Sequence, residues 1–299
     1  MNGINTKIDG FLFVDKIKSK ASFWRNISIC LLFMVFASII NSNKNAELKK
    51  HGDYIAKVKI SGEINNYTFD EKRLDSLKDD DNIKAVILEI DSPGGEVVPS
   101  EILYTRLKEI SSIKPVVTTI KGLGASGAYM VALASEYIVA YNTSLVGSIG
   151  VLFQSANISN SLDKIGVKVK LYKSSKLKAS PNVFEETNEE VDSVIREKVN
   201  DMYSYFLDIF MTNRKINRRD AMDIANGQVY TGRQALNFKL IDKIGDTNDL
   251  ISYLKDKGVE TEDIFYYDIT LKDTVIKKMI KSFSGKKMVD GKKLLFLYN

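Results

Sequence analysis

Hydrophobic and polar residues alternate along the chain in two ways, which indicates strands separated by helices. From residue 54 onward, short apolar runs rich in Val, Ile and Tyr have the length and composition of β-strands; they cover 54–60, 83–91, 115–120, 137–141 and 168–172. Between these runs the apolar residues recur at helical spacing, in stretches near 70–77, 99–110, 126–135 and 162–165, and a longer helix is expected from about residue 188. This order predicts an α/β fold with a mostly parallel sheet, whose chemistry lies at the C-terminal ends of the strands.

The most apolar part of the chain precedes these strands. Eighteen uncharged residues separate Arg25 from Lys44, and as a helix they span about 27 Å, close to the roughly 30 Å hydrocarbon core of a bilayer. We therefore expect a single transmembrane helix over 26–43. Basic residues precede it, so the positive-inside rule places the N-terminus in the cytoplasm and the following domain on the extracytoplasmic side. A cleaved signal peptide is the alternative, but the polar lead is long and no clear cleavage site follows.

Charge divides the chain further. The formal net charge of +5 combines a net +3 on residues 1–25 and a net +6 on residues 272–299, which leaves a net −4 on the body between them. We expect a basic N-terminus over 1–25, a linker over 44–53, a globular domain over 54–271 and a basic C-terminal tail over 272–299. An acidic body argues against nucleic-acid binding, and basic ends favour proximity to anionic lipid, although a solvated tail is an equal alternative at the C-terminus.

Two residue counts exclude several kinds of site. The chain has one cysteine, Cys30, and one histidine, His51, and both precede the predicted domain. A single histidine cannot form a two-histidine metal site, and a single cysteine cannot form a thiolate cluster or an internal disulfide. We expect no metal and no cofactor. If the domain is an enzyme, its proton transfers depend on Lys, Tyr, Asp or Glu.

Glycine-rich turns follow two of the predicted strands. Gly122, Gly124 and Gly127 match the G-x-G-x-x-G pattern of dinucleotide-binding turns, but no acidic residue follows at the required distance, so this match is weak. Ser126 lies where the second turn enters a helix, with the Gly127 amide beside it. An accessible hydroxyl next to an N–H donor suits a nucleophile, because the donor can stabilise an oxyanion. The alternative is that Ser126 only caps the helix.

A serine nucleophile needs a base, and the histidine count leaves lysine as the common choice. Lys173, Lys176 and Lys178 lie in one loop after the last predicted strand. Burial in an apolar cleft lowers the pKa of a lysine and allows it to act as a neutral base. Three lysines in one loop are more often a solvated surface.

Five ordered motifs between about residue 54 and residue 245 resemble the signal peptide peptidase A (protease IV) family of serine peptidases. They read DSPGG at 91–95, GASGAY at 124–129, VGSIGV at 146–151, KASPNVFE at 178–185 and GQVYTGRQA at 227–235 followed by LID at 240–242. The resemblance implies a Clp-protease/crotonase-like fold built from repeated ββα units, and a peptidase domain over 54–271. Two departures are Ala128, where a glycine is usual, and the sequence of 174–177 before the lysine.

The resemblance also implies roles for residues. It assigns the nucleophile to Ser126, the general base to Lys178 with Lys176 as the nearest rival, and the orientation of the lysine to Ser148. It assigns the oxyanion hole to backbone N–H groups; these belong to Gly94, Gly95 and Gly127. The expected reaction is hydrolysis of peptide bonds through an acyl-enzyme.

One serine motif and one lysine motif are present, which resembles the short form of the family. That form assembles as a homo-oligomeric ring in which adjacent protomers share each site, cleaves remnant signal peptides and resides at the bacterial inner membrane, and here the N-terminal helix is the expected lipid contact. Two alternatives remain open at this stage: a catalytically silent scaffold of the same fold in a membrane protease complex, and a crotonase-type acyl-CoA enzyme.

Overall fold

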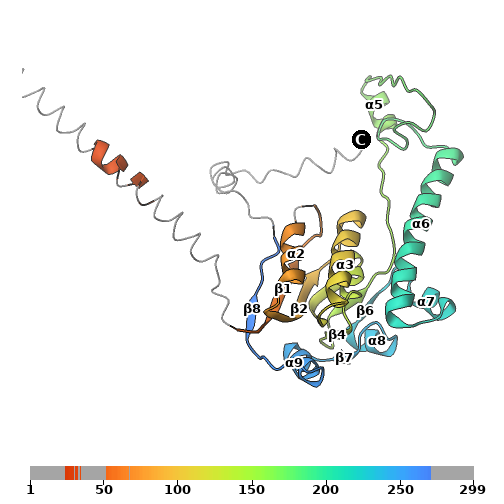
Figure 1. Ribbon diagram of the computed structural model, residues 1–299. Coiled ribbons are helices and arrows are strands. Elements are labelled where there is room, and N and C mark those ends of the chain that lie inside the picture. Colours follow the sequence, from red (N-terminus) through yellow and green to blue (C-terminus); the bar gives the residue numbers. More distant parts are fainter. Residues whose placement is uncertain (1–23, 30, 33, 35–51, 67, 271–299) are drawn as a thin grey trace, which may run out of the picture. The chain divides into compact units, whose positions relative to one another are not determined.

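The structure is a computed structural model that describes residues 24–29, 31, 32, 34, 52–66 and 68–270 (Figure 1). The chain divides into two units, Met1–Gly52 and Asp53–Asn299. Within the described residues, no helix combines the length and the apolar character needed to cross a bilayer. Cys30, His51, residues 35–43 of the predicted anchor and the whole basic tail over 272–299 lie outside the described residues.

One sheet organises the second unit. Across the described residues its strands are β1 (Tyr54–Ser61), β2 (Ile83–Ser92), β3 (Val116–Ala125), β4 (Tyr137–Ala140), β5 (Leu145–Gly147), β6 (Val229–Thr231), β7 (Lys243–Ile244) and β8 (Ile264–Tyr266). The order is β6-β5-β3-β2-β1-β8, and β4 pairs with both β3 and β7. Every pairing is parallel except β5 with β6. The predicted α/β class with a mostly parallel sheet is therefore confirmed.

Helices alternate with the strands as far as β4; β5 then follows β4 directly, and three helices separate β5 from β6. The helices are α2 (Glu71–Asp79), α3 (Val97–Ser111), α4 (Gly127–Ala132), α5 (Ser159–Lys164), α6 (Glu189–Arg214), α7 (Arg218–Ile224), α8 (Gly232–Asn237) and α9 (Thr247–Asp256). Local sequence explains their starts, because side chains that accept from helix N–H groups satisfy donors that lack an intrahelical partner. Asp70 caps α2, Asn188 caps α6, and Thr231 with Gln234 forms a capping box on α8.

The predicted strand over 168–172 is wrong. These residues have no strand assignment, and apolar side chains along them are exposed, including Tyr172 at 93%. A strand needs a neighbour to bond its N–H and C=O groups, and no strand of the described chain pairs with this segment. The alternating apolar residues of 168–172 therefore form a surface that the other described residues of the chain leave exposed.

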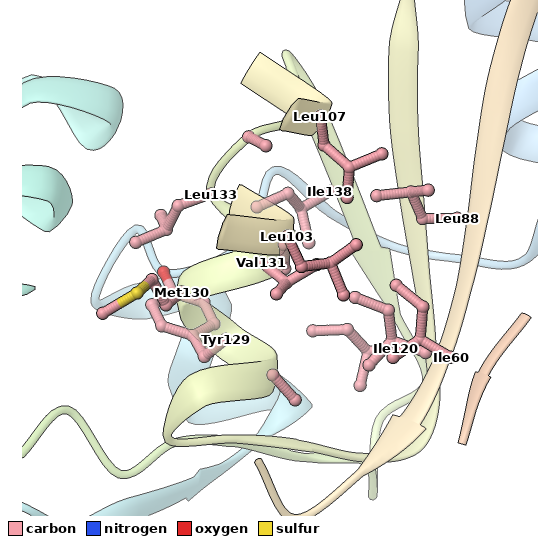
Figure 2. Packing of buried hydrophobic residues seen from close by; sticks show 14 of the residues in the cluster. Ile60, Leu88, Leu103, Leu107, Ile120, Tyr129, Met130, Val131, Leu133 and Ile138 are labelled. Atoms are coloured by element: carbon pink, nitrogen blue, oxygen red, sulfur yellow. The ribbon is translucent and has the colours of Figure 1, made fainter. Parts of the chain in front are cut away.

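Side-chain alternation along the strands builds two cores. Ala56, Val58 and Ile60 of β1 face the larger core, which extends under α2, α3 and α4. Figure 2 shows this packing, with Leu103 and Leu107 of α3 set against strand residues, and Tyr129, Met130 and Val131 of α4 and the following Leu133 beside them. The opposite face buries Ile55 against Leu250 and Leu254 of α9. The larger core thus fixes α4, the helix that begins directly after Ser126.

The segment over 151–188, which we call the arm, leaves the sheet after β5 and returns at α6. It contains α5 and the lysine loop, which lie by the N-terminal end of α6 in Figure 1. The C-terminal half of α6 joins the larger core through Phe206, Leu207 and Phe210. The arm has no member among the buried residues of either core. Its position depends on α6 and on contacts within the arm.

Candidate active site

Ser126 occupies a strained turn between β3 and α4. Its backbone has φ 53° and ψ −128°, a region that residues other than glycine rarely adopt. Its N–H donates to Gly147 O at 2.8 Å, and its carbonyl accepts from Tyr129 N at 2.9 Å. The side chain is half-buried, does not cap α4, and makes no hydrogen bond to any described residue. The capping role alone therefore does not explain Ser126, whose hydroxyl is free to react.

The turn after β2 lies directly against this serine. Gly94 has φ +90°, and a Cβ on it would lie 2.6 Å from Gly127 N and 2.9 Å from Ser126 Cβ. Only glycine permits both this conformation and this approach. The turn is fixed by a parallel bridge in which Ile64 N donates to Gly94 O at 2.8 Å and Glu96 N donates to Ile64 O at 2.9 Å.

The three glycine amides differ in their partners. The Gly94 N–H donates to Ser92 Oγ at 3.1 Å. The N–H groups of Gly95 and Gly127 have no acceptor within the part of the chain that the structure describes, and Gly95 N lies 3.5 Å from where a Cβ on Gly127 would be. Two unpaired donors thus lie close together in the turns that adjoin Ser126, and stabilisation of an oxyanion needs donors of this kind.

Sequence reasoning missed two side chains that hold this turn. Ser92 is fully buried, and its hydroxyl donates to Gly62 O at 2.6 Å while accepting from Gly94 N. Asp91 Oδ1 accepts from Leu123 N at 3.0 Å and so ties the end of β2 to β3. Both belong to the DSPGG motif, whose polar residues were the available signal.

Ser148 lies beside Ser126 at the end of the adjacent strand. Ala125 pairs with Gly147 across β3 and β5, so the two serines follow in register. Ser148 also has a positive φ, 51°, and its N–H donates to Gln228 O at 2.7 Å. The motif over 227–235 therefore supports Ser148 through its backbone.

The lysine loop is on the arm, and the structure does not bring it to Ser126 within one copy. Lys176 and Lys178 are exposed, and neither ammonium has a partner among the described residues. Lys173 differs, because its ammonium contacts the Glu185 carboxylate and donates to Ser180 Oγ at 3.0 Å. Of the three lysines, Lys173 is thus already engaged.

The arm and helix α4 contact α6 at different points along its length. Residues 181–187 of the arm line a cavity of about 310 Å³ together with Asp192 and Ile195, near the start of the helix. Near its other end, Phe210 contacts Tyr129 of α4 with ring centroids 6.3 Å apart. Fifteen residues separate Ile195 from Phe210, which is about 22 Å along the helix axis. The cavity of the arm and the contact with α4 therefore lie toward opposite ends of α6, and no contact between Lys178 and Ser126 is present among the described residues.

The dinucleotide-binding pattern receives no support from the geometry. Gly122 and Gly124 lie inside β3 and only Gly127 begins a helix, whereas a dinucleotide-binding pattern needs its glycines in the turn itself. Among the described residues there is also no group of three His, Cys, Asp or Glu side chains arranged to hold a metal ion.

Comparison with known proteins identifies the family of the chain. The family model described as Peptidase family S49 matches residues 108–262, and that described as Clp protease matches residues 50–146. A putative protease of Methanocaldococcus jannaschii is 31% identical over 268 residues, which cover 81% of this chain and 86% of that protein. A putative protease of Synechocystis sp. is 32% identical over 197 residues, covering 65% of this chain and 71% of that protein.

A third relative is a putative signal peptide peptidase SppA of Enterococcus faecium, 33% identical over 184 residues that cover 61% of this chain and 54% of that protein. The family match covers more than half of the chain, and it includes Ser126, Ser148 and Lys178. The chain therefore belongs to Peptidase family S49 and is a serine peptidase of the signal peptide peptidase A type.

Proposed function

We propose that the protein is a membrane-anchored endopeptidase that degrades cleaved signal peptides with a Ser126–Lys178 dyad. The observation that carries the proposal is the unpaired Ser126 hydroxyl beside the unpaired N–H groups of Gly95 and Gly127. A nucleophile with unpaired N–H donors in the adjoining turns supports acyl transfer, which needs both.

In this mechanism the neutral Lys178 amine accepts the proton of the Ser126 hydroxyl, and the oxygen attacks a peptide carbonyl. The Gly95 and Gly127 N–H groups stabilise the tetrahedral oxyanion, while Gly94 allows the close approach of the two turns. The Lys178 ammonium then protonates the leaving amine, which breaks the C–N bond and leaves an acyl-enzyme. Water, deprotonated by the same amine, releases the second product. Ser148 accepts a hydrogen bond from the ammonium and orients it.

The base comes from an adjacent copy of the chain. The absence of a contact between Lys178 and Ser126 among the described residues, and the exposure of Lys178 on the arm, support a base that reaches the serine of a neighbouring copy. Large apolar side chains on the arm are exposed, including Leu152 at 83% and Tyr172 at 93%. Burying such side chains stabilises association by about 25 cal/mol per Å² of apolar area before the costs of ordering. The homo-oligomeric ring therefore completes the site and covers the arm.

The substrate class follows from the anchor and the relatives. A helix over 26–43 that holds the domain at the extracytoplasmic face of the inner membrane raises the local concentration of apolar peptides released into the bilayer. A relative with 33% identity is named as a putative signal peptide peptidase. Remnant signal peptides are apolar segments of this kind.

A fluorophosphonate probe on membranes tests the dyad. Wild-type protein becomes labelled, and labelling is lost in Ser126→Ala and in Lys178→Ala; Lys176→Ala is the matched control and keeps it. In a ring with heterologous interfaces, an equal mixture of Ser126→Ala and Lys178→Ala protomers regains about a quarter of the wild-type sites. Full labelling of Lys178→Ala refutes the assignment of Lys178 as the base. Failure of the mixture to recover labelling after verified subunit exchange refutes a site shared between protomers.

A further inference from the structure

We propose that Glu185, held by Lys173 and Asn182, positions the Lys178 amine for proton transfer and keeps it unpaired. This inference rests on the proposed function of Lys178 as the base. It assigns a positioning role to three polar side chains that do not take part in the reaction themselves.

The first part of the network is a buried amide. Asn182 is only 8% exposed. Its Nδ2 donates to Glu185 Oε2 at 2.8 Å and to Ala179 O at 3.0 Å, and its Oδ1 accepts from Phe184 N at 2.9 Å. Ala179 directly follows Lys178, so this amide connects the backbone of the lysine turn to the Glu185 carboxylate.

The second part is an ion pair that closes the loop. The Lys173 ammonium contacts Glu185 Oε2 and donates to Ser180 Oγ at 3.0 Å, and the Lys173 side chain is only 18% exposed. Lys173 precedes Lys178 by five residues and Glu185 follows it by seven. The carboxylate therefore joins both ends of the segment that presents the base. Its pKa lies below the usual value because Lys173 and then Asn182 donate hydrogen bonds to the charged form.

The position of the turn that carries Lys178 matters because a lysine side chain has four rotatable bonds. Its amine is placed reproducibly beside Ser126 only if the Cα is fixed. A displacement of about 1 Å at a reacting group can lower a rate by about 10²-fold. The turn itself has only two local backbone bonds, Lys178 N to Ser175 O at 3.2 Å and Ser180 N to Leu177 O at 3.3 Å. The network supplies the remaining restraint.

The same network controls charge around the base. A free carboxylate near a lysine amine pairs with the ammonium form and so reduces the neutral fraction that acts as base. Glu185 is instead committed to Lys173. The other charged groups facing Glu185 are Asp192 and Arg196 of α6, which line the same cavity and pair with each other at 3.9 Å. Glu186, the adjacent carboxylate, accepts from Asn160 Nδ2 at 3.3 Å on α5.

The test compares Lys178→Ala and four further variants of the full-length, assembled protein on a fluorogenic apolar peptide. We expect Lys173→Met and Glu185→Gln to lower kcat at least 10-fold with KM changed less than twofold, because both release the turn without altering substrate contacts. In Lys173→Met, Glu185 becomes free to pair with Lys178, so the acidic limb of the pH profile of kcat moves to higher pH. Lys173→Arg preserves the ion pair and keeps more than half of the activity. Glu186→Gln is the matched control and stays at wild-type activity.

The outcomes separate this inference from the proposed function. If Lys178→Ala is inactive while Lys173→Met and Glu185→Gln retain wild-type kcat, the positioning role is overturned and the dyad stands. If Lys178→Ala is active, the dyad fails, and the inference that depends on it fails with it. If Lys173→Arg loses as much kcat as Lys173→Met, or the pH profile of Lys173→Met does not move, the ion pair does not act through the base, which also overturns the inference.

Discussion

The ion pair between Arg214 and Asp242 connects α6 to the segment that supports α4. Arg214 Nη2 donates to Asp242 Oδ1 at 2.8 Å, Nη1 donates to Oδ2 at 3.1 Å, and Nε donates to Lys239 O at 2.6 Å. Asp242 Oδ2 also accepts from Ile138 N of β4 at 2.7 Å. The Arg214 side chain is only 9% exposed, so solvent replaces little of this bonding if the guanidinium is removed.

Replacing Arg214 by methionine leaves a poorly solvated carboxylate and an unpaired carbonyl. Loss of one partner of a buried ion pair costs about 3–5 kcal/mol, and the lower end applies because Asp242 is partly exposed and keeps its bond to Ile138 N. For a domain of this size, about 3 kcal/mol lowers Tm by about 6–12 °C.

Thermal unfolding followed by circular dichroism measures this change, and Arg218→Met is the matched control. Arg218 pairs with Asp208 at 3.7 Å, but both side chains are 61% exposed, so the loss is about 0–1 kcal/mol. Equal Tm changes in the two variants would refute the reasoning, because burial is the difference that matters. A Tm for Arg214→Met within 2 °C of wild type would refute it as well.

Two further predictions concern the oxyanion turn and pH. Ser92→Ala leaves Gly62 O and Gly94 N without their partner. We therefore expect the free energy of unfolding to fall by about 1–3 kcal/mol and peptide hydrolysis to slow. A fall in unfolding free energy no larger than that of the exposed control Ser112→Ala contradicts this expectation. The pKa of Glu185 is depressed below its usual 4.5, so its stabilisation is present above that pH and is lost as pH falls through the folded-state pKa. Denaturant unfolding should therefore show that the stability difference between wild type and Glu185→Gln shrinks from pH 7 to pH 3, and a larger difference in acid contradicts the sign.

The sequence predicted the α/β class and most elements, because each depends on local patterning. β1, β2 and the start of α6 lie within about two residues of the predicted bounds, since alternation and a capping Asn188 specify them without reference to the rest of the chain. The failure at 168–172 has the opposite cause. Strand formation requires a neighbouring strand, and apolar alternation alone does not say whether one exists.

The sequence by itself determined the chemistry that is possible: one histidine that precedes the predicted domain, a serine in a glycine-rich turn, and lysines as the common choice of base. Tertiary structure decided which groups meet. It placed the Gly95 turn against Gly127 and Ser126 because a parallel bridge joins segments distant in the chain, and it placed the cavity of the arm and the α4 contact about 22 Å apart along α6. Strand pairing and helix length set these distances, and neither can be read from local spacing.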